Sequence, residues 1–220
     1  MSHIFLVRHG EVEGNSIAAG GRLTFAGWGD KPLTQRGELQ AKAVAARLSS
    51  ENLSAIYASD LMRAQDTARE IAQRHDLDVC TDKRLREVNY GAWEGLGLDE
   101  ILADWPDVWD ARNRDPENIA PPQGESYADL WRRVEPAWNE IVQSHGEDER
   151  IAIVAHNGTL RILLCHLLGM PFAHFKRIQT SNCGVSHLEV KRAIEYSNAE
   201  KFSIVAHNIN ETNHLKEIGS

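Results

Sequence analysis

Two histidines in this sequence stand where an apolar run ends and a polar segment begins. Arg8-His9-Gly10-Glu11 follows the run 4–7, and His156 follows the run 151–155. Short apolar and β-branched runs of this kind are typical of buried parallel strands. Ligands bind at the carboxyl ends of such strands in open α/β sheets. The sequence therefore places an arginine and two imidazoles where nucleophilic or acid–base chemistry is expected.

The residues after His156 favour binding of an anion. Gly158 opens a predicted helix that carries Arg161, and the N-terminus of a helix offers unpaired N–H donors to negative charge. The pentapeptide Ile-Val-Ala-His-Asn occurs a second time around His207, but neither a glycine nor a helical pattern follows it. We therefore interpret His156 as functional and His207 as structural or exposed at the surface.

Arg63 lies in the first turn of a helix predicted over about 61–73, after a strand at 55–58. Ser59 or Asp60 is the expected N-cap. A cation in the first turn opposes the helix dipole. Taken alone, a helical arginine is solvated, but this position is reasonable if the side chain reaches an anion in the crevice.

Glu87 lies in the segment 85–96, which is rich in glycine and aromatic residues. A loop glutamate is usually a solvated charge, but a bound anion and partial burial would raise its pKa and make it a candidate general acid. His9, His156 and Glu87 could also hold zinc. Two arginines in the same pocket would repel that cation, so we expect neither a metal nor another cofactor.

Strand-like runs alternate with helical patterns along the chain. Strands are predicted at 4–7, 55–58, 78–80, 151–155, 185–190 and 202–206, and helices from Thr34 to 48, over about 61–73, from Ser126 to about 142, and over 158–168. This alternation predicts an α/β fold with a mostly parallel central sheet and helices on both faces.

The segment 98–125 has a different composition, with prolines and tryptophans among charged residues. We predict that it is an inserted lid rather than a core layer. Its residues Trp105, Trp109, Arg112 and Arg114 are either substrate contacts or lid-core aromatics and solvated charges. The loop 20–28 is a second candidate for the mouth of the site.

Length and charge exclude several functions. The 220 residues fit one domain, and a net charge of −8 argues against a general binder of nucleic acid or acidic membranes, while still allowing a local basic site for a small anion. No apolar stretch has the length of a membrane span, and the N-terminus has no signal-peptide pattern. Cys80, Cys165 and Cys183 are odd in number and show no metal-type spacing, so reduced, buried thiols in the cytoplasm are expected.

Taken together, these motifs resemble the histidine phosphatase superfamily, the group that includes cofactor-dependent phosphoglycerate mutases and many small phosphatases. The resemblance runs in family order from residue 4 to about 190 and implies one phosphoglycerate mutase-like domain over 1–220. It rests on Leu6–Glu11 with Asn15, Pro32–Thr34 with Arg36 and Gly37, Ser59–Ala68, Glu87–Gly95, Gly124–Ser126 and Ala155–Arg161.

The resemblance also implies a role for each candidate. His9 would take the phosphoryl group as phosphohistidine, and Glu87 would protonate the leaving alcohol and then activate water. The phosphoryl oxygens would be surrounded by Arg8, Arg63 and His156, with Asn15 and the backbone N–H of Asn157 assisting. Guanidinium groups supply the positive charge and positioning that phosphoryl transfer needs.

Three functions stay open within this resemblance: a phosphatase, a phosphoglycerate mutase, and an inactive phosphate-binding module. The segment Asn89–Gly95, with Trp93-Glu94-Gly95, resembles the phosphatases, and Val12 and Gly14 replace residues typical of mutases. A phosphatase is therefore favoured. Its substrate would be a small phosphorylated metabolite, such as a phosphoglycerate, phosphoserine, alpha-ribazole phosphate or a sugar phosphate, and a homodimer is left open.

Overall fold

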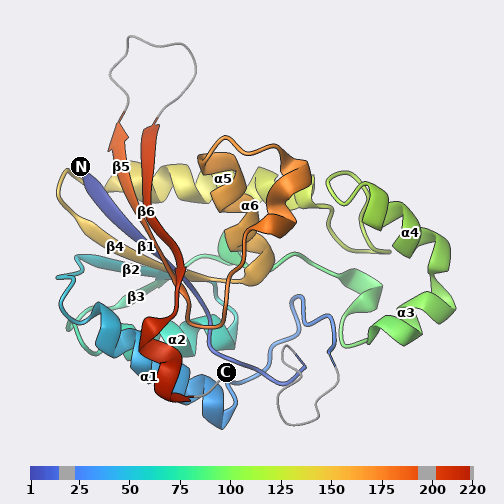
Figure 1. The fold of residues 1–220 in the computed structure, drawn as a ribbon, viewed down its shortest axis with the longest axis horizontal. Helices are drawn as coiled ribbons and strands as arrows, with labels where there is room; N and C mark the ends of the chain where they lie inside the picture. The colour runs from blue at the N-terminus through green and yellow to red at the C-terminus, as the bar shows by residue number, and fades with distance from the viewer. Residues whose placement is uncertain (15–22, 193–201, 219–220) are drawn as a thin grey trace.

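The computed structural model describes residues 1–14, 23–192 and 202–218 and has a central sheet in the order β3-β2-β4-β1-β5-β6 (Figure 1). Neighbouring strands among β1 to β4 pair parallel, whereas β5 pairs antiparallel with β1 and with β6. The predicted mostly parallel α/β sheet is confirmed. The strands are β1 (Ser2–Arg8), β2 (Ala55–Ala58), β3 (Val79–Thr81), β4 (Arg150–Ala155), β5 (Val185–Arg192) and β6 (Phe202–Glu211).

Helices cover both faces of the sheet, with α1 and α2 on one side and α5 and α6 on the other (Figure 1). Within the described residues, no helix combines the length and apolar character needed to cross a membrane. The helices are α1 (Gln35–Leu48), α2 (Met62–Ala72), α3 (Leu98–Asp104), α4 (Pro106–Arg114), α5 (Tyr127–Ser144) and α6 (Asn157–Leu167), with the short 3-10 helices η2 (Lys83–Leu85), η3 (Gly91–Trp93), η4 (Phe172–Arg177) and η5 (Asn213–Ile218).

The first strand is buried on both faces, as its continuous apolar run predicts. Successive side chains of a strand point to opposite faces, so Ile4 and Leu6 pack in the core under α5 and α6. Phe5 and Val7 pack in the second core, under α1 and α2. Because side chains of β1 are buried in both cores, its last residues have a fixed position at the carboxyl ends of the parallel strands.

Thr34 and Ser126, the residues at which two helices were predicted to start, cap α1 and α5. The Thr34 hydroxyl accepts a hydrogen bond from the N–H of Gly37 (3.0 Å), and the Ser126 hydroxyl accepts one from the N–H of Asp129 (3.1 Å). These bonds satisfy N–H groups that have no partner inside the helix.

The predicted cap of α2 is wrong. The cap position is Leu61, which makes no side-chain capping bond. The Ser59 hydroxyl accepts only from the N–H of Leu61 (3.3 Å), and both carboxylate oxygens of Asp60 bind the guanidinium of Arg86 (2.7 and 2.6 Å). Asp60 therefore forms a bidentate ion pair with Arg86 and does not cap the helix.

Both edge strands also differ from the prediction. β6 continues to Glu211, so His207 lies inside a strand and not after one. On the opposite edge, Cys80 in β3 is exposed, while Cys165 and Cys183 are buried as expected. An edge strand has a neighbour on one side only, so polar and exposed residues can continue it.

Candidate active site

The carboxyl ends of β1 and β4 meet at one edge of the sheet. Arg8 pairs with Ala155, and the N–H of His9 donates to the carbonyl of Ala155 (3.0 Å). This register places His9 beside His156, the next residue of the neighbouring strand, with their ring centroids 5.0 Å apart. The two histidines that the sequence singled out therefore lie together.

A cavity of about 360 Å³ opens at this edge. Its described lining contains cations, one carboxyl group, and an apolar wall. The lining residues are Arg8, His9, Gly14, Leu23, Thr24, Phe25, Ala26, Gly27, Arg63, Glu87, Tyr90, Leu98, Trp109 and Asn157. Five residues that sequence reasoning singled out thus share one cavity, and His156 lies against it through the ring of His9.

His9 is held as a neutral imidazole with one free nitrogen. Its side chain is buried, and its Nδ1 lies 2.6 Å from the carbonyl oxygen of Gly10. A carbonyl oxygen only accepts, so Nδ1 carries the hydrogen and Nε2 carries the lone pair. Burial, followed by the charges of Arg63 and Arg8, holds the pKa of His9 well below its usual range. Nε2 is therefore available as a nucleophile at neutral pH.

His156 is fully buried, and neither of its ring nitrogens has a hydrogen-bond partner among the described residues. Burial, then Arg63, His9 and Arg8, lower its pKa well below the usual value. Buried polar groups are nearly always paired in native structures. An unpaired imidazole next to the cavity therefore points to a ligand that completes it.

Arg8 and Arg63 approach the cavity from β1 and α2. Nη1 of Arg8 donates to the carbonyl of Thr180 (2.8 Å), and burial lowers the pKa of Arg8 to about 10, so it is protonated at neutral pH. Arg63 is buried, and its two Nη atoms donate to the carbonyls of Gly29 (2.8 Å) and Gly27 (2.7 Å). The Nε atoms of both arginines have no partner among the described residues. Arg63 thus holds the 27–29 loop as well as lining the cavity.

The carboxylate of Glu87 binds at the N-terminus of α6. The carboxylate accepts from the N–H groups of Gly158 (3.1 Å) and Thr159 (3.3 Å), and from that of Val88 (2.9 Å). A Cβ at Gly158 would lie 2.5 Å from Glu87 Oε1. The glycine after His156 therefore provides space for the carboxyl group.

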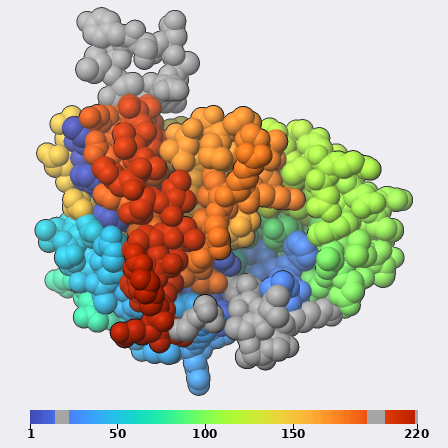
Figure 2. Space-filling model, viewed as in Figure 1, coloured from blue at the N-terminus to red at the C-terminus, as the bar shows by residue number. Residues whose placement is uncertain are grey.

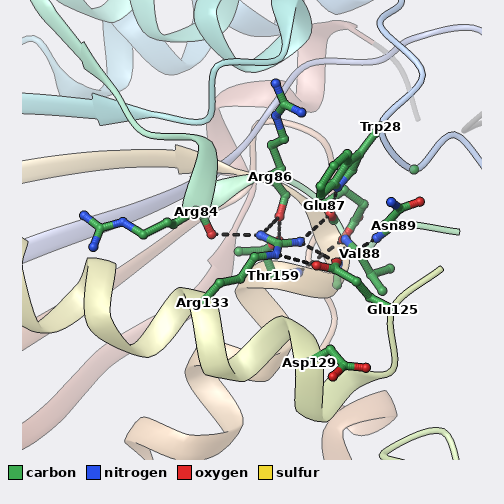
Figure 3. A network of polar contacts seen from close by, with 12 residues as sticks. Trp28, Arg84, Arg86, Glu87, Val88, Asn89, Glu125, Asp129, Arg133 and Thr159 are labelled. Carbon is green, nitrogen blue, oxygen red and sulfur yellow. Dashed lines mark hydrogen bonds and ion pairs between the residues drawn. The ribbon is translucent and has the colours of Figure 1, made fainter. Parts of the chain in front are cut away.

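Arg133 of α5 holds the backbone around Glu87 (Figure 3). Its Nη2 donates to the carbonyl of Glu87 (2.7 Å), and its Nη1 donates to the carbonyls of Arg84 (2.8 Å) and Arg86 (2.9 Å). Glu125 accepts from Nε (2.9 Å) and Nη2 (2.8 Å) of the same guanidinium. Sequence reasoning noted Glu125 in a motif but missed Arg133, because nothing near it in the sequence marks it.

The other predicted site residues have separate positions. Asn157 lines the cavity, and its Oδ1 accepts from the hydroxyl of Thr180 (2.6 Å). Glu11 pairs with Arg36 (3.3 Å), which agrees with an orienting role for this carboxylate. Asn15 lies outside the described residues, as do positions 20–22 of the loop proposed for the mouth.

The segment 98–125 is partly helical and lies at one end of the molecule (Figure 2). Trp109 of α4 lines the cavity and lies edge-on to Phe25, with ring centroids 6.0 Å apart. Arg112 is buried against the rings of Tyr90 and Tyr127 (5.4 and 5.1 Å). Trp105 is half-buried and Arg114 exposed, and neither is among the described lining residues. Of the four lid candidates, only Trp109 lines the described cavity.

Comparisons with known proteins agree with this geometry. The model of the histidine phosphatase superfamily (branch 1) matches residues 4–199. The chain is 33% identical over 196 residues to phosphoserine phosphatase 1 of Hydrogenobacter thermophilus, covering 88% of this chain and 90% of that protein. It is 34% identical over 193 residues to a probable phosphoglycerate mutase GpmB of Yersinia enterocolitica, covering 88% and 87%.

A solved structure of a mycobacterial glucosyl-3-phosphoglycerate phosphatase superposes with a TM-score of 0.80 at 30% identity. The match covers 96% of this chain and 99% of that one. The chain belongs to the histidine phosphatase superfamily.

Proposed function

We propose that the protein hydrolyses phosphomonoesters of small metabolites through a phosphohistidine on His9, without a metal ion. The observation that carries this proposal is the state of His9. Its Nδ1 is bound to the carbonyl of Gly10, and its ring is buried in a cavity lined by Arg8 and Arg63. This fixes a neutral nucleophile beside the positive charge that a phosphoryl group requires.

The proposed reaction has two steps. In the first, Nε2 of His9 attacks phosphorus, the bond from phosphorus to the ester oxygen breaks, and Glu87 gives its proton to the leaving alcohol. In the second, Glu87 takes a proton from water while the water oxygen attacks phosphorus, and the phosphorus–nitrogen bond breaks to release phosphate. Glu87 is the only carboxyl group in the described lining, which supports its role in both steps.

Arg8, Arg63 and the ring N–H of His156 are proposed to contact the phosphoryl oxygens. The guanidinium cations and the N–H donors stabilise the negative charge on the equatorial oxygens while the phosphoryl group is transferred. Asn157 is proposed to contribute its backbone N–H from the first residue of α6. Asn15 stays a prediction.

Trapping of the intermediate tests the nucleophile. Rapid acid-free quench with a labelled phosphomonoester is expected to give a base-stable, acid-labile phosphoenzyme in the wild type and in His174→Ala, a histidine outside the described lining. In His9→Ala this species is expected to be absent and turnover lost. A phosphoenzyme in His9→Ala would contradict the assignment, and activity lost to chelators and restored by zinc would contradict the metal-free mechanism.

The same assays separate the alternatives. Isomerisation of 3-phosphoglycerate in the presence of 2,3-bisphosphoglycerate would favour a mutase. No turnover of p-nitrophenyl phosphate and no phosphoenzyme would leave phosphate binding alone. The proposed phosphatase is expected to release inorganic phosphate from the ester without returning it to the sugar acid.

The apolar wall of the cavity bears on the substrate class. Leu23, Phe25, Tyr90, Leu98 and Trp109 form this wall, and Phe25 packs edge-on against Tyr90, with ring centroids 4.9 Å apart. Apolar pocket walls bind apolar ligand surface, which supports a leaving alcohol with an aromatic or heterocyclic part. In a panel of phosphoglycerates, phosphoserine, alpha-ribazole phosphate and sugar phosphates, the highest kcat/KM is expected for the heterocyclic ester, and a preference for phosphoserine would contradict this substrate class.

A further inference from the structure

Three histidines from three neighbouring strands meet on the sheet face that carries α1 and α2. They are His3 of β1, His187 of β5 and His207 of β6, and each offers a ring nitrogen within 4.8 Å of the others. Nδ1 of His3 lies 3.0 Å from Nε2 of His187. The ring centroids of His187 and His207 are 4.7 Å apart, and those of His3 and His187 are 5.2 Å apart.

The strand pairing explains why these side chains converge. Phe5 pairs with His187, so His3, two residues before Phe5 on the same face, lies diagonal to His187. Between β5 and β6 the register shifts, because Leu188 pairs with Ala206 while His187 pairs with Asn208. His207 is the extra residue of this bulge.

The bulge changes the backbone pairing around His207. The Oδ1 of Asn208 accepts from the N–H of His187 (3.1 Å), which holds the irregular pairing in place. Bulges are frequent next to functional sites. The ring of His207, a residue of an edge strand, stacks on the ring of His187 of the inner strand β5.

This cluster is separate from the catalytic cavity. His3 precedes His9 by six residues of an extended strand, which corresponds to about 20 Å along the chain. The N-terminal end of β1 lies beside the β5–β6 hairpin, away from α3 and α4 (Figure 1). None of the three histidines is among the described lining residues of the cavity. An ion bound here would therefore not take part in phosphoryl transfer.

The three rings have the properties of metal ligands. His3 and His187 are half-buried, and each offers a ring nitrogen to the cluster. Neutral imidazole is a preferred ligand of Zn²⁺, Cu²⁺ and Ni²⁺. Glu189 accepts from Nε2 of His207 (3.1 Å), which leaves the Nδ1 lone pair of His207 free to bind. Carboxylates hold metal-binding histidines in this way.

Among the described residues, the cations near the cluster are Arg150, Lys191 and the N-terminal ammonium of Met1, which is paired with Asp148. Arg150 is bound to Glu51, and Lys191 lies 3.8 Å from Glu189. The repulsion that these cations exert on a metal ion is therefore reduced. The cluster differs in this respect from the catalytic cavity, where Arg8 and Arg63 donate to backbone carbonyls, which carry no full charge.

We propose that His3, His187 and His207 form a binding site for a divalent transition-metal ion, with Zn²⁺ as the expected occupant. Tetrahedral zinc with Zn–N bonds of 2.0–2.1 Å requires nitrogens about 3.4 Å apart. The His3–His187 pair is within a few tenths of an ångström of that spacing. The ring planes are inclined by 25° to 41°, so His207 must turn, and its 44% exposed side chain has room to do so.

Binding changes the tautomer of one ring. A neutral imidazole carries one N–H, so the hydrogen in the 3.0 Å contact between His3 and His187 belongs to one of the two rings. When both contacting nitrogens bind the ion, this hydrogen moves to the other nitrogen of its ring, and no proton is released. Water supplies the fourth ligand from the open side. The ion would tie β1 to the β5–β6 hairpin and would therefore raise the thermal stability of the folded chain.

The test uses the full chain without an affinity tag, stripped with EDTA. Titration with ZnCl₂ at pH 7.5, followed by calorimetry and by thermal melting, is expected to show one tight site per chain and a rise in Tm. Co²⁺ is expected to give the visible absorption of a tetrahedral site, and Mg²⁺ to have no effect. His3→Ala and His207→Ala are each expected to weaken binding at least tenfold and to abolish the Tm rise.

Controls locate the ion. His174→Ala is expected to bind zinc as the wild type does, and so is His156→Ala. Phosphatase activity of His207→Ala equal to that of the wild type would show that this variant is folded, since its side chain is exposed. Zinc binding that survives in His3→Ala and His207→Ala, or that is lost in His156→Ala alone, would overturn the proposal. So would the absence of any binding at micromolar zinc.

Discussion

Glu87 is held from two sides, and this arrangement determines what single substitutions should do. Its carboxylate is bound by the first N–H groups of α6, while its carbonyl accepts from Arg133 of α5 and from Trp28 (2.7 Å). Arg133 also bonds to two further carbonyls of the 84–87 backbone. The position of the proposed general acid therefore depends on a residue that does not line the described cavity.

Arg133→Met is expected to lower kcat by up to about 10²-fold, because displacement of a reacting group by about an ångström has that cost. KM is expected to change little, since the phosphoryl ligands Arg8 and Arg63 are untouched. Steady-state kinetics with p-nitrophenyl phosphate measure both parameters. Arg132→Met, a change on the same helix at an exposed residue, is the matched control, and equal losses in the two variants would contradict the positioning role.

The backbone of the loop that follows β1 lies very close to the backbone of α1. A Cβ at Gly37 would lie 2.2 Å from the carbonyl oxygen of Glu11, and one at Gly10 would lie 2.5 Å from the carbonyl oxygen of Gly37. The absence of a side chain at Gly10 and at Gly37 therefore allows the two backbones to approach closely. α1 is seated against the loop that carries His9.

Gly37→Ala is expected to lower the free energy of unfolding by about 1–3 kcal/mol, the usual cost of overpacking. Activity is expected to fall as well, because the loop next to His9 must move. Urea denaturation measures the stability, and Gly146→Ala, where a Cβ meets nothing within 4 Å, is the control. Wild-type stability in Gly37→Ala would show that the two backbones can separate freely.

Helix α4 contributes Trp109 to the apolar wall. A change of this residue is therefore expected to alter the specificity for the leaving alcohol. Trp109→Ala is expected to reduce kcat/KM for p-nitrophenyl phosphate about tenfold, the value of one lost apolar contact, and to reduce that for phosphoserine less. Trp105→Ala, a tryptophan outside the described lining, should leave both values unchanged. Equal losses on both substrates in Trp109→Ala would contradict an apolar leaving-group site.

The molecule as a whole carries several histidines whose folded pKa lies below the unfolded value of about 6.5. As the pH falls below 6.5, the unfolded chain binds protons that the folded chain does not, so the folded state loses stability. This stability is fully present above pH 6.5 and is lost as the pH falls towards the folded pKa. Burial in both cores and the arginines beside the cavity are the cause.

When the pH falls from 7.5 to 5.0, each buried histidine such as His156 is expected to lower the free energy of unfolding by about 2 kcal/mol. Urea denaturation at several pH values, in phosphate-free buffer with EDTA, measures the slope. His156→Asn is expected to show a shallower slope by about that amount. The same slope in this variant would show that His156 already carries a proton in the folded protein.

Much of the fold and of the candidate site could be predicted from local patterns. The apolar runs before His9 and His156 predicted two strands, and in the structure these strands are neighbours. Arg8, Arg63 and Glu87, which the sequence also singled out, line the cavity at their carboxyl ends. The prediction succeeded because a buried parallel strand imposes its apolar pattern on consecutive residues, and the site begins where the pattern stops. The fold class and the chemistry of the site were therefore readable along the chain.

Only the tertiary structure decided which residues distant in sequence are in contact. Glu87 occupies the N-terminus of α6, 71 residues away, Arg86 binds the carboxylate of Asp60, and Arg133 holds the 84–87 backbone. His3 meets His187 across 184 residues of sequence. The physical reason is that such distances depend on the order and register of the strands and on a bulge, and a local pattern encodes none of these.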